Sequence, residues 1–424
     1  MAIPSLAMIP SGYKDGKVYS VLPTNGDGDF TFYRGSNATR VNSSGLIEEV
    51  GVNVPRLDYS DGGCPVLLTE PQSRNLVTYS EDFSDSSWFK PIDGFTVNSN
   101  NSISPDGSVN CDFLEEKNSL NGSKQISVTH SFLAGFTTFS VNIEPVGRQW
   151  VRLFVYDGTS FISVYFDVLN GIVGTTPLGV VAKIKQVKNF YRCEATFPTL
   201  SGSGFCYISG AISDGGDDNY TGESGKGYNV WGAQVEQQSY ATSYIKTEGT
   251  TVTRNADVVT GTGDVTTFNS QEGVLYAEIA AFADDDSSFR CISLNDGTSS
   301  NVVKFVFYLN NIFAETVVGG VNQGTTTYVF PSITSSNKIA LKYKLNNFSL
   351  WINGVEVDTD SVGSVLAPNT LNNLSFDNGA ALFFYGKTKD IRVYKTALTD
   401  SELEELTSWE SFILMANGLN YTIK

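Results

Sequence analysis

The chain has 424 residues, of which 41% are hydrophobic, 12% aromatic and 17% charged, and its formal net charge is -17. This length suits two or three domains, and the aromatic, glycine-rich composition favours strands and tight turns over long helices. The negative charge disfavours a general nucleic-acid-binding or anionic-membrane surface, so we predict neither partner.

The first residues, MAIPSLAMIPSGYKDGK, do not match a secretory signal. Two prolines interrupt them, and they contain no uninterrupted apolar stretch of about 7 to 15 residues. Nowhere does the chain approach the roughly 20 consecutive apolar residues of a membrane-spanning helix. We therefore expect a protein that is made in a cytoplasm without Sec export.

Residues 1–75 form an irregular opening. Short apolar pieces are bounded there by Gly, Asn, Asp or Pro, as in VYSVLPTNGDGDFTFYRG and VPRLDYSDGGCPVLL. The segment lacks the continuous alternation that an independent core needs. We predict an attachment or oligomerisation segment whose short strands pair with the next domain or with another copy of the chain.

Residues 76–247 carry regular strand signals. Residues 150–156 (WVRLFVY) and 161–168 (FISVYFDV) alternate with period two, and Asn170 and Gly171 follow as a hairpin turn. Further short strands, in KNFYRCEATF, SGFCYISGAI and GYNVWGAQVE, are separated by turn residues. This pattern predicts a β-sandwich or jelly roll over residues 76–247.

A Thr-rich connector is predicted at residues 248–269, and a second sandwich domain follows at 270–424. Its clearest signal is FSLWINGVEVD, in which apolar residues alternate and then stop at a turn. Asn353 and Gly354 supply the two positive φ angles that a type I′ hairpin requires.

One short helix is expected near the C-terminus, in TDSELEELTSW. Thr399 can cap its first turn, Glu402 can complete a capping box, and Leu403, Leu406 and Trp409 fall on one helical face. We expect this face to pack on the second sandwich. The predicted fold class is therefore all-β: an irregular N-terminal attachment segment, two antiparallel β-sandwich (jelly-roll) domains and a short C-terminal helix.

Catalytic groups are scarce. His130 is the only histidine, so a Ser-His-Asp or Cys-His arrangement is nearly excluded, as is a His-rich zinc site. The five cysteines form no CxxC pair, and most are expected to be reduced core residues. We predict no catalytic residue.

A polysaccharide hydrolase is the enzymatic alternative, because two carboxylates suffice for glycoside hydrolysis. Glu278 is the nearest candidate, in the strand-like run LYAEIAAFA. Tyr276 and Ala280 occupy the neighbouring positions on its face, so this strand offers a single acid. A loop aspartate would have to be the second one, and an aspartate run follows at 284–286.

Calcium is the one candidate cofactor, at two acidic turns. Asp27 and Asp29 lie at alternate positions in NGDGDF, as in the first half of an EF-hand loop, but the second half of that pattern fails. Asp214, Asp217 and Asp218 form a second cluster of oxygen ligands in a probable loop. Ordinary turn chemistry favours the same residues, so both interpretations stay open.

Sandwich domains that bind sugars often stack aromatic rings on the sugar faces. Trp351, Trp231 and Tyr165 lie in strand patterns and are the candidates for such a glycan-binding platform, although core packing would explain them as well. Trp351 is the best of the three, because Leu350 and Ile352 claim the core face and leave its ring on the other.

Three parts of the chain carry a resemblance to known proteins. IPSGYKDGKVYSVLPTNGDGDFTFYRG and LLTEPQSRNLVTYSEDFSDSSW, within about the first 90 residues, resemble the leader of structural proteins of tailed phages that infect Bacteroidetes, including crAss-like phages. WGAQVEQQSYATSYIKTEGTTVTRNADV resembles the closing strand of carbohydrate-binding-like jelly rolls in phage proteins. FSLWINGVEVD and IRVYKTALTDSELEELT are similar to laminin-G or concanavalin-A-like sandwiches.

The resemblance implies a fibre, spike or decoration protein on the virion surface, assembled in the host cytoplasm. A head fibre is favoured over a tail fibre, built as a homo-oligomer, dimer or trimer, that contacts other virion proteins through the N-terminal segment. Its sandwiches would hold host or environmental glycans weakly and in many copies. A tail-spike depolymerase that uses Glu278, or a purely structural capsid decoration protein, are the alternatives.

Overall fold

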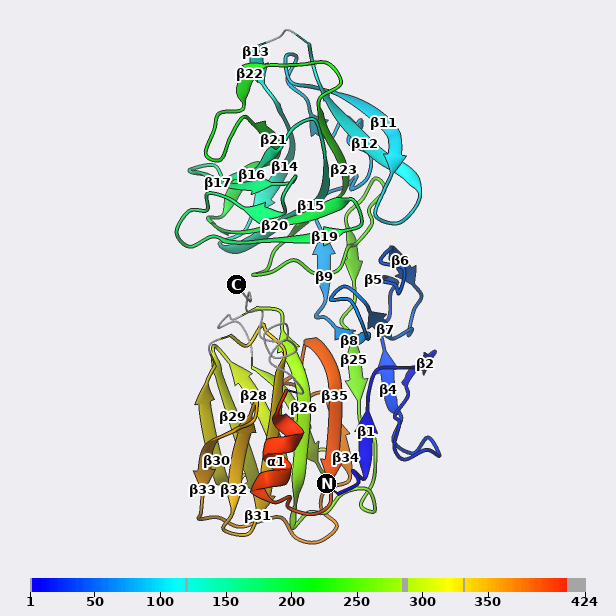
Figure 1. Cartoon of the computed structure of the whole chain (residues 1–424), viewed down its shortest axis with the longest axis vertical. Helices are drawn as coiled ribbons and strands as arrows, with labels where there is room; N and C mark the ends of the chain where they lie inside the picture. Colours follow the sequence, from blue (N-terminus) through cyan, green and yellow to red (C-terminus); the bar gives the residue numbers. More distant parts are fainter. Residues whose placement is uncertain (1, 119–120, 284–288, 331, 410–424) are drawn as a thin grey trace. The chain divides into compact units, whose positions relative to one another are not determined.

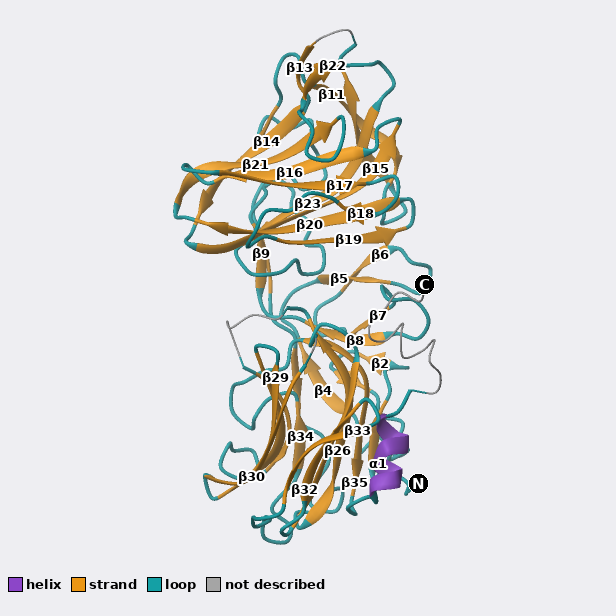
Figure 2. Ribbon diagram, turned by 60° about the vertical axis from the view of Figure 1, so that its left-hand side comes forward, coloured by secondary structure: helices purple, strands orange, loops and turns teal. Residues whose placement is uncertain are grey.

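The computed structural model describes residues 2–118, 121–283, 289–330 and 332–409 (Figure 1). Strands dominate the described chain, with one short helix, so the predicted all-β class is confirmed (Figure 2). The chain divides into two compact units. Unit 1 contains Met1–Gly35, Gly51–Pro71 and Ala256–Lys424, and unit 2 contains Ser36–Val50 and Gln72–Asn255.

Residues 1–75 do not form a segment of their own, which corrects the predicted boundary. In unit 1, β1 (Leu6–Met8) pairs with β35 (Gly386–Tyr394). In unit 2, β9 (Ser73–Asn75) pairs with β24 (Val252–Arg254). Short strands have unpaired backbone groups that need partners, and partners distant in the chain meet that need here.

The predicted connector at residues 248–269 is also built into the sheets. Besides β24, it contains β25 (Val258–Thr260), which pairs with β4 (Phe30–Tyr33) in unit 1. Because β25 pairs with a strand from the opening of the chain, the first and last parts of unit 1 are joined. The period-two signal of such three- and four-residue strands is too short to reveal this pairing from sequence.

Unit 1 is a sandwich of two main antiparallel sheets. The larger has the order β33 (Val355–Asp360), β32 (Phe348–Ile352), β31 (Asn337–Lys344), β26 (Glu272–Ala281), β35, β8 (Val66–Thr69) and β7 (Arg56–Asp58), with β1 also on β35. The smaller has the order β30 (Val321–Val329), β29 (Asn311–Val318), β28 (Val302–Tyr308), β27 (Arg290–Asn295) and β34 (Asn373–Ser375). A further small sheet has the order β2 (Tyr13–Lys14), β3 (Lys17–Val18), β4 and β25.

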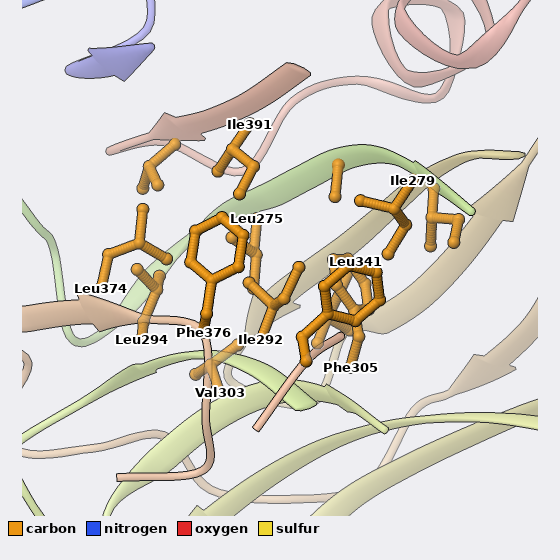
Figure 3. Close-up of a cluster of buried hydrophobic side chains, with 14 of the residues drawn as sticks. Leu275, Ile279, Ile292, Leu294, Val303, Phe305, Leu341, Leu374, Phe376 and Ile391 are labelled. Atoms are coloured by element: carbon orange, nitrogen blue, oxygen red, sulfur yellow. The ribbon is translucent and has the colours of Figure 1, made fainter. Parts of the chain in front are cut away.

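The core of unit 1 is formed by side chains from both main sheets. Leu275 and Ile391 from the larger sheet meet Ile292 and Phe305 from the smaller one (Figure 3). All four are buried. Burying such aliphatic and aromatic side chains is the main favourable term in folding, at about 1.5–3 kcal/mol each.

Unit 2 is a second sandwich, of two six-stranded sheets. The β16 sheet has the order β10 (Trp88–Phe89), β14 (Gln125–Phe132), β21 (Gly202–Ala211), β16 (Trp150–Tyr156), β17 (Phe161–Asp167) and β18 (Ile172–Val173). The β23 sheet has the order β11 (Phe95–Ile103), β12 (Val109–Glu116), β23 (Gly227–Glu236), β15 (Gly135–Val146), β20 (Phe190–Thr199) and β19 (Val181–Val187). Three two-stranded pairs complete the unit: β5 (Ala38–Val41) with β6 (Ile47–Val50), β13 (Asn121–Ser123) with β22 (Asn219–Thr221), and β9 with β24.

The turn predicted in the second sandwich is confirmed. Asn353 has φ 51° and Gly354 has φ 88°, and they join β32 to β33. Phe348, Leu350 and Ile352 lie in the core cluster of unit 1, as their alternation predicted. The sequence therefore determines both the turn and the face of this strand.

The predicted helix is confirmed as α1 (Asp400–Thr407), but it ends before Trp409, which was predicted to share its apolar face. The Thr399 hydroxyl accepts a hydrogen bond from the backbone N–H of Glu402, whose side chain accepts one from the backbone N–H of Thr399. Leu403 and Leu406 are buried, and α1 contacts β31, β32 and β33. Among the residues described, no helix has the length and apolar character needed to cross a membrane.

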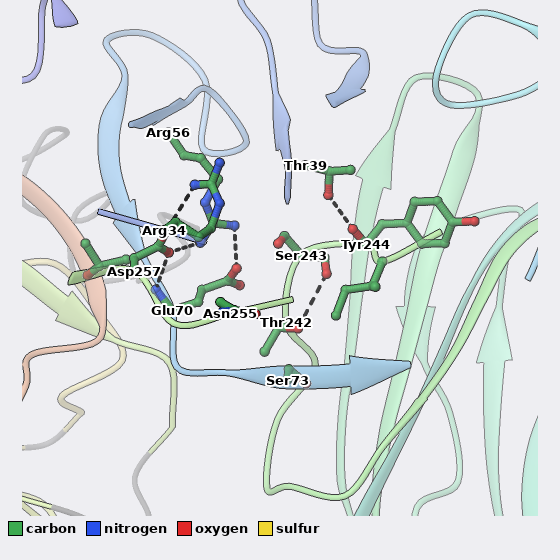
Figure 4. Close-up of polar contacts among 12 residues, drawn as sticks. Arg34, Thr39, Arg56, Glu70, Ser73, Thr242, Ser243, Tyr244, Asn255 and Asp257 are labelled. Carbon is green, nitrogen blue, oxygen red and sulfur yellow. Dashed lines mark hydrogen bonds and ion pairs between the residues drawn. The ribbon is translucent and has the colours of Figure 1, made fainter. Parts of the chain in front are cut away.

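A fully buried charge cluster joins distant parts of unit 1 (Figure 4). The Arg34 guanidinium lies 3.1 Å from the Asp257 carboxylate, and Arg56 pairs with both Asp257 and Glu70. Asp257 also accepts the backbone N–H of Glu70 at 2.8 Å. Burial alone would lower the pKa of Arg56, but the charges of Asp257 and Glu70 raise it above its usual value. Two cations and two anions therefore balance each other.

This cluster lies close to the places where the chain leaves unit 1. Arg34, Glu70 and Asp257 each lie within two residues of a point at which the chain passes from one unit to the other. Since the four side chains come from remote positions, no local pattern in the sequence predicts them as partners. Removing one member would leave an uncompensated buried charge, the costly case for such pairs.

Candidate functional site

The glycan platform predicted at Trp231 is not available, because the ring is buried in unit 2. It extends from the outer face of the β23 sheet and packs against Tyr244, with ring centres 4.5 Å apart. Ile47 of β6 and Phe190 of β20 belong to the same apolar cluster. The hairpin of β5 and β6 thus contributes to the cover over this face, and Trp231 presents no ring surface to a ligand.

Trp351 is covered as well. Its neighbours Leu350 and Ile352 do face the core, as the alternation predicts. The opposite face, however, carries α1, and Trp351 clusters there with Leu403 and Leu406. The predicted packing of the helix on this sandwich is what removes the predicted sugar platform.

Tyr165 is also buried, but it lies at the margin of an open face. It occupies an outward position of β17, and its hydroxyl donates a hydrogen bond to the Gly216 carbonyl at 3.1 Å. The Arg152 guanidinium lies 6.0 Å from its ring centre. Tyr165 therefore supports the edge of this face and does not form its surface.

The open face is the outer side of the β16 sheet. Val151, Leu153 and Val155 of β16 point into the core of unit 2. The residues between them must point the opposite way, because side chains alternate along a strand. Arg152 and Phe154 are these residues, and Trp150 and Tyr156, at the two ends of the strand, lie on the same side and are only partly buried.

Strand register gathers more rings on this side. Tyr207 of β21 lies opposite Phe154, and Tyr156 lies between Phe205 of β21 and Phe161 of β17. Facing residues of an antiparallel pair project on the same side of the sheet. At the far edge, β10 adds a further outward ring opposite Ser127 of β14. We call the following set the aromatic face: Phe89, Phe154, Tyr156, Phe161, Phe205 and Tyr207.

Five of the six rings of the aromatic face, all except Phe89, contact another ring of the set. Phe154 and Tyr207 stack with centres 4.0 Å apart and planes 5° apart. Tyr156 and Phe161 stack at 4.4 Å and 24°. Contacts of this kind add about 0.5–1.5 kcal/mol beyond the burial of apolar area. The rings are therefore positioned in advance, so a ligand would lose little free energy in ordering them.

Three rings remain open to solvent. Phe161 is 67% exposed, Phe89 63% and Phe205 36%. An exposed phenylalanine alone needs no explanation, but contiguous apolar surface on a folded unit often marks a binding site. Phe161 is the most accessible ring. It lies at the start of β17, where no further strand pairs, because β18 pairs only with Phe166 and Asp167 at the other end.

A charged pair lies beside the rings. The Arg152 guanidinium lies 4.2 Å from the centre of the Phe154 ring, within the range of a cation–π contact. The same group donates a hydrogen bond to Asp218 at 2.8 Å, and Asp218 also accepts one from the Ser209 hydroxyl at 3.0 Å. The site thus combines flat apolar rings with a small number of fixed polar groups.

Both aspartates of the first predicted calcium turn already accept hydrogen bonds from the chain. Asp27 accepts a hydrogen bond from the Asn25 amide at 2.6 Å. Asp29 accepts one from the backbone N–H of Ser20 at 2.9 Å. These are the bonds of an ordinary turn, so they supply no separate reason to place Ca²⁺ there.

The second predicted calcium turn flanks the aromatic face. Asp214 and Asp217 each accept a backbone N–H, at 2.7 and 3.0 Å. Asp218 is committed to Arg152, as described above. Within the described part of the chain, no three His, Cys, Asp or Glu side chains are grouped as a metal ion would need.

His130 lies in β14 with its ring edge against Phe132, at a centre distance of 4.8 Å. Burial lowers its pKa to about 4, so the imidazole is neutral at physiological pH. Its strand pairs with β21 at Gly204, where no acid or nucleophile is opposite it. These surroundings give the histidine a packing role.

Glu278 has an unpredicted neighbour, because β26 pairs with β35 so that Asp390 lies opposite it. Each carboxylate has its own cation: the Lys389 ammonium is 3.7 Å from Glu278, and the Arg392 guanidinium is 2.6 Å from Asp390. Burial raises the pKa of Asp390, which Arg392 offsets in part. The aspartate run at 284–286 lies outside the described residues.

Comparison with known proteins does not assign a family. No protein-family model matches the chain, and no curated protein matches it. Among solved structures, the CBM40 of Ruminococcus gnavus IT-sialidase bound to α2,3-sialyllactose aligns with 19% identity and a TM-score of 0.30, over 35% of this chain and 94% of that chain.

Parts of larger proteins align in the same way. The binding domain of botulinum neurotoxin DC in complex with rat synaptotagmin II shows 12% identity and a TM-score of 0.30, over 36% of this chain and 40% of that chain. The receptor-binding domain of botulinum neurotoxin type G shows 14% identity and a TM-score of 0.27, over 32% and 37%. At these values no ligand can be transferred to the present chain.

Proposed function

We propose that the chain is a non-enzymatic surface-adhesion protein that binds glycans through the aromatic face of unit 2. One observation carries this proposal: stacked aromatic rings lie on an open sheet face, with Phe161 as the most exposed ring. The predicted platforms at Trp231, Trp351 and Tyr165 are buried and are not part of the proposed binding surface.

The chemistry of this face suits sugars. A pyranose ring has an apolar C–H face that stacks on an aromatic ring, and a rim of hydroxyl groups that need hydrogen-bond partners. Phe161 and Phe205 supply exposed apolar rings, while the Tyr207 hydroxyl on the same face supplies a polar group. Because the rings are already stacked, binding costs little additional ordering.

Each single contact is expected to be weak, so adhesion depends on copy number. Linking several binding sites raises the effective local concentration and can increase avidity by about 10²–10⁴-fold without any new contact. We therefore propose a homo-oligomer, a dimer or trimer, that presents several aromatic faces at once.

We further propose that this oligomer is a phage virion surface fibre, on the head in preference to the tail. The support is the resemblance of the opening and of the junction near WGAQVEQQSYATSYI to structural proteins of phages of Bacteroidetes. Residues 1–75 would contact other virion proteins through surface that is left after their strands have paired inside units 1 and 2.

A glycan array tests the proposal. The full chain, displayed as a multimer, should bind a subset of bacterial surface and mucin glycans. Phe161→Ala should weaken that binding about tenfold, since it removes one exposed stacking ring. Phe136→Ala is the matched control, because Phe136 is 45% exposed but lies on β15 in the other sheet. A flat array, or equal losses in both variants, would refute glycan binding at this face.

A second candidate function is polysaccharide hydrolysis in unit 1. The observation that favours it is the cross-strand placement of Glu278 opposite Asp390. Against it, each carboxylate is already paired with a cation. Release of reducing ends from a bound polysaccharide, abolished by Glu278→Gln and by Asp390→Asn, would establish an enzyme. Unchanged polymer length would leave adhesion as the function.

A further inference from the structure

We infer that the aromatic face selects neutral glycans and rejects anionic ones such as uronate-containing, sialylated or sulfated chains. This inference names the ligand class of the face and so rests on the proposed function. It follows from the charges and hydrogen-bonding groups around the rings.

Cations are nearly absent from the strands that carry the rings. In β14, β21, β16 and β17, Arg152 is the single Lys or Arg. Its guanidinium is bound to Asp218 at 2.8 Å and packed over the Phe154 ring. A carboxylate or sulfate on a sugar would have to break this pair to gain a charge-assisted hydrogen bond.

The loop beside the face adds negative charge. Asp214, Asp217 and Asp218 follow β21, and the Tyr165 hydroxyl donates to the carbonyl of Gly216 in this loop, which ties the loop to the margin of the face. Hydrogen bonding, first by the backbone N–H of Asn219, lowers the pKa of Asp217, so this exposed carboxylate stays ionised at neutral pH. An anionic ligand would approach like charge, which costs affinity and slows association.

Uncharged polar groups take further outward positions. The exposed Thr129 lies opposite Phe205, and the partly buried Ser163 of β17 lies opposite Phe154, whereas Ser127, opposite Tyr207, is buried. Hydroxyl groups both donate and accept hydrogen bonds, so they match the hydroxyl rim of a neutral sugar. The face therefore offers aromatic rings for stacking and hydroxyl groups for hydrogen bonds. These four strands carry no free cation that could bind an anionic sugar.

The experiment measures retention of the full chain on immobilised polysaccharides. Dextran, laminarin and yeast mannan are the neutral probes, and polygalacturonate, hyaluronan and polysialic acid are the acidic ones. We expect retention on at least one neutral polymer and about tenfold weaker retention on every acidic one. Raising NaCl from about 0.05 to 0.5 M should change neutral binding by less than about twofold, because screening acts on charge interactions.

Two variants distinguish glycan binding by the aromatic face from its preference for neutral glycans. Asp217→Lys should raise retention on acidic polymers several-fold and leave neutral retention unchanged, whereas Phe161→Ala should weaken retention on neutral ones. Stronger binding of the wild-type chain to acidic than to neutral polymers, lost in high salt, would overturn the inference while leaving glycan adhesion in place. Absence of retention on all six polymers would overturn adhesion by this face together with the inference.

Discussion

The two sheets of unit 2 carry aromatic residues on their outer faces, but on the β23 sheet the ring of Trp231 is covered by other parts of the chain. On the β23 sheet, Trp231 lies under Tyr244 and under Ile47 of the β5–β6 hairpin. On the β16 sheet, Phe161 and Phe205 remain exposed. The two faces have similar patterns along their strands and differ in what the rest of the chain places over them.

This difference teaches that alternation shows which side of a strand a ring occupies, but not whether that side is covered. The β5–β6 hairpin comes from residues 38–50, remote in sequence from β23. A ring under such a cover contributes to folding, whereas a ring on the open face can contribute to binding. Variants on the two faces should therefore separate stability from glycan affinity.

The largest effect on stability is expected at Trp231, which is covered on the outer face of the β23 sheet. Trp231→Ala should lower the free energy of unfolding of unit 2 by about 3–5 kcal/mol, because it leaves a large cavity among buried side chains. Urea denaturation followed by tyrosine and tryptophan fluorescence measures this change. Glycan binding per folded molecule should be unchanged, and a folded variant that has lost binding would contradict the assignment of the site.

Phe154 should show an intermediate effect, because it is buried between its stacked neighbours on the open face. Phe154→Ala should lower the free energy of unfolding by about 2 kcal/mol and weaken glycan binding severalfold, since Tyr207 loses its stacking partner. Phe154→Leu is the control that keeps apolar volume. It should recover most of the stability without restoring the affinity, and full recovery of both would argue against a role for ring stacking.

The buried Glu236 of β23 should make the free energy of unfolding of unit 2 depend on pH. Burial raises the pKa of Glu236, which accepts hydrogen bonds from Ser73 and Thr242. The folded state therefore binds this proton more tightly than the unfolded state does. The stabilising contribution of the proton is present at low pH and is lost as pH rises through the raised pKa. Each tenfold difference in proton affinity between the two states corresponds to about 1.4 kcal/mol.

Glu236→Gln tests this sign. The variant lacks the titration, so its stability relative to the wild type should increase between about pH 4 and pH 8. Urea midpoints at several pH values measure the trend. Parallel pH profiles for the two proteins would show that Glu236 has an ordinary pKa in the folded state.

The smallest effect on stability is expected at the most exposed ring. Phe161→Ala should lower the free energy of unfolding by about 1 kcal/mol or less, the value of its stacking contact with Tyr156, although it weakens glycan binding. Phe136→Ala should be equally mild for stability and should leave binding intact. A large loss of stability in Phe161→Ala would place this ring in the packing of unit 2 instead of in its binding surface.

Much of the fold is predictable because its signals are local. Asn353 and Gly354 require a tight hairpin turn, and Thr399 with Glu402 defines the start of α1. The strand at 150–156 follows from its alternation. These features depend on residues that are close in sequence, and a single chain contains the information for them.

The site is only partly predictable. The alternation along the strand correctly places Trp351 on the side away from the core. That α1 covers this side depends on tertiary packing, which the alternation does not reveal. The pairing of Phe154 with Tyr207 depends on the register between β16 and β21, which are separated in sequence by other strands. The buried cluster around Asp257 likewise joins four remote positions. The only local sequence signal for the aromatic face is the series of outward aromatic residues at positions 154, 156 and 161.

The most direct test of the central claim is hydroxyl-radical footprinting of the full chain with and without the polysaccharide that it retains best. Bound glycan should protect Phe161, Phe205 and Tyr207, while Phe136 on the other sheet should keep its reactivity. Protection confined to unit 1, or to Phe136, would contradict the assignment of glycan adhesion to the aromatic face.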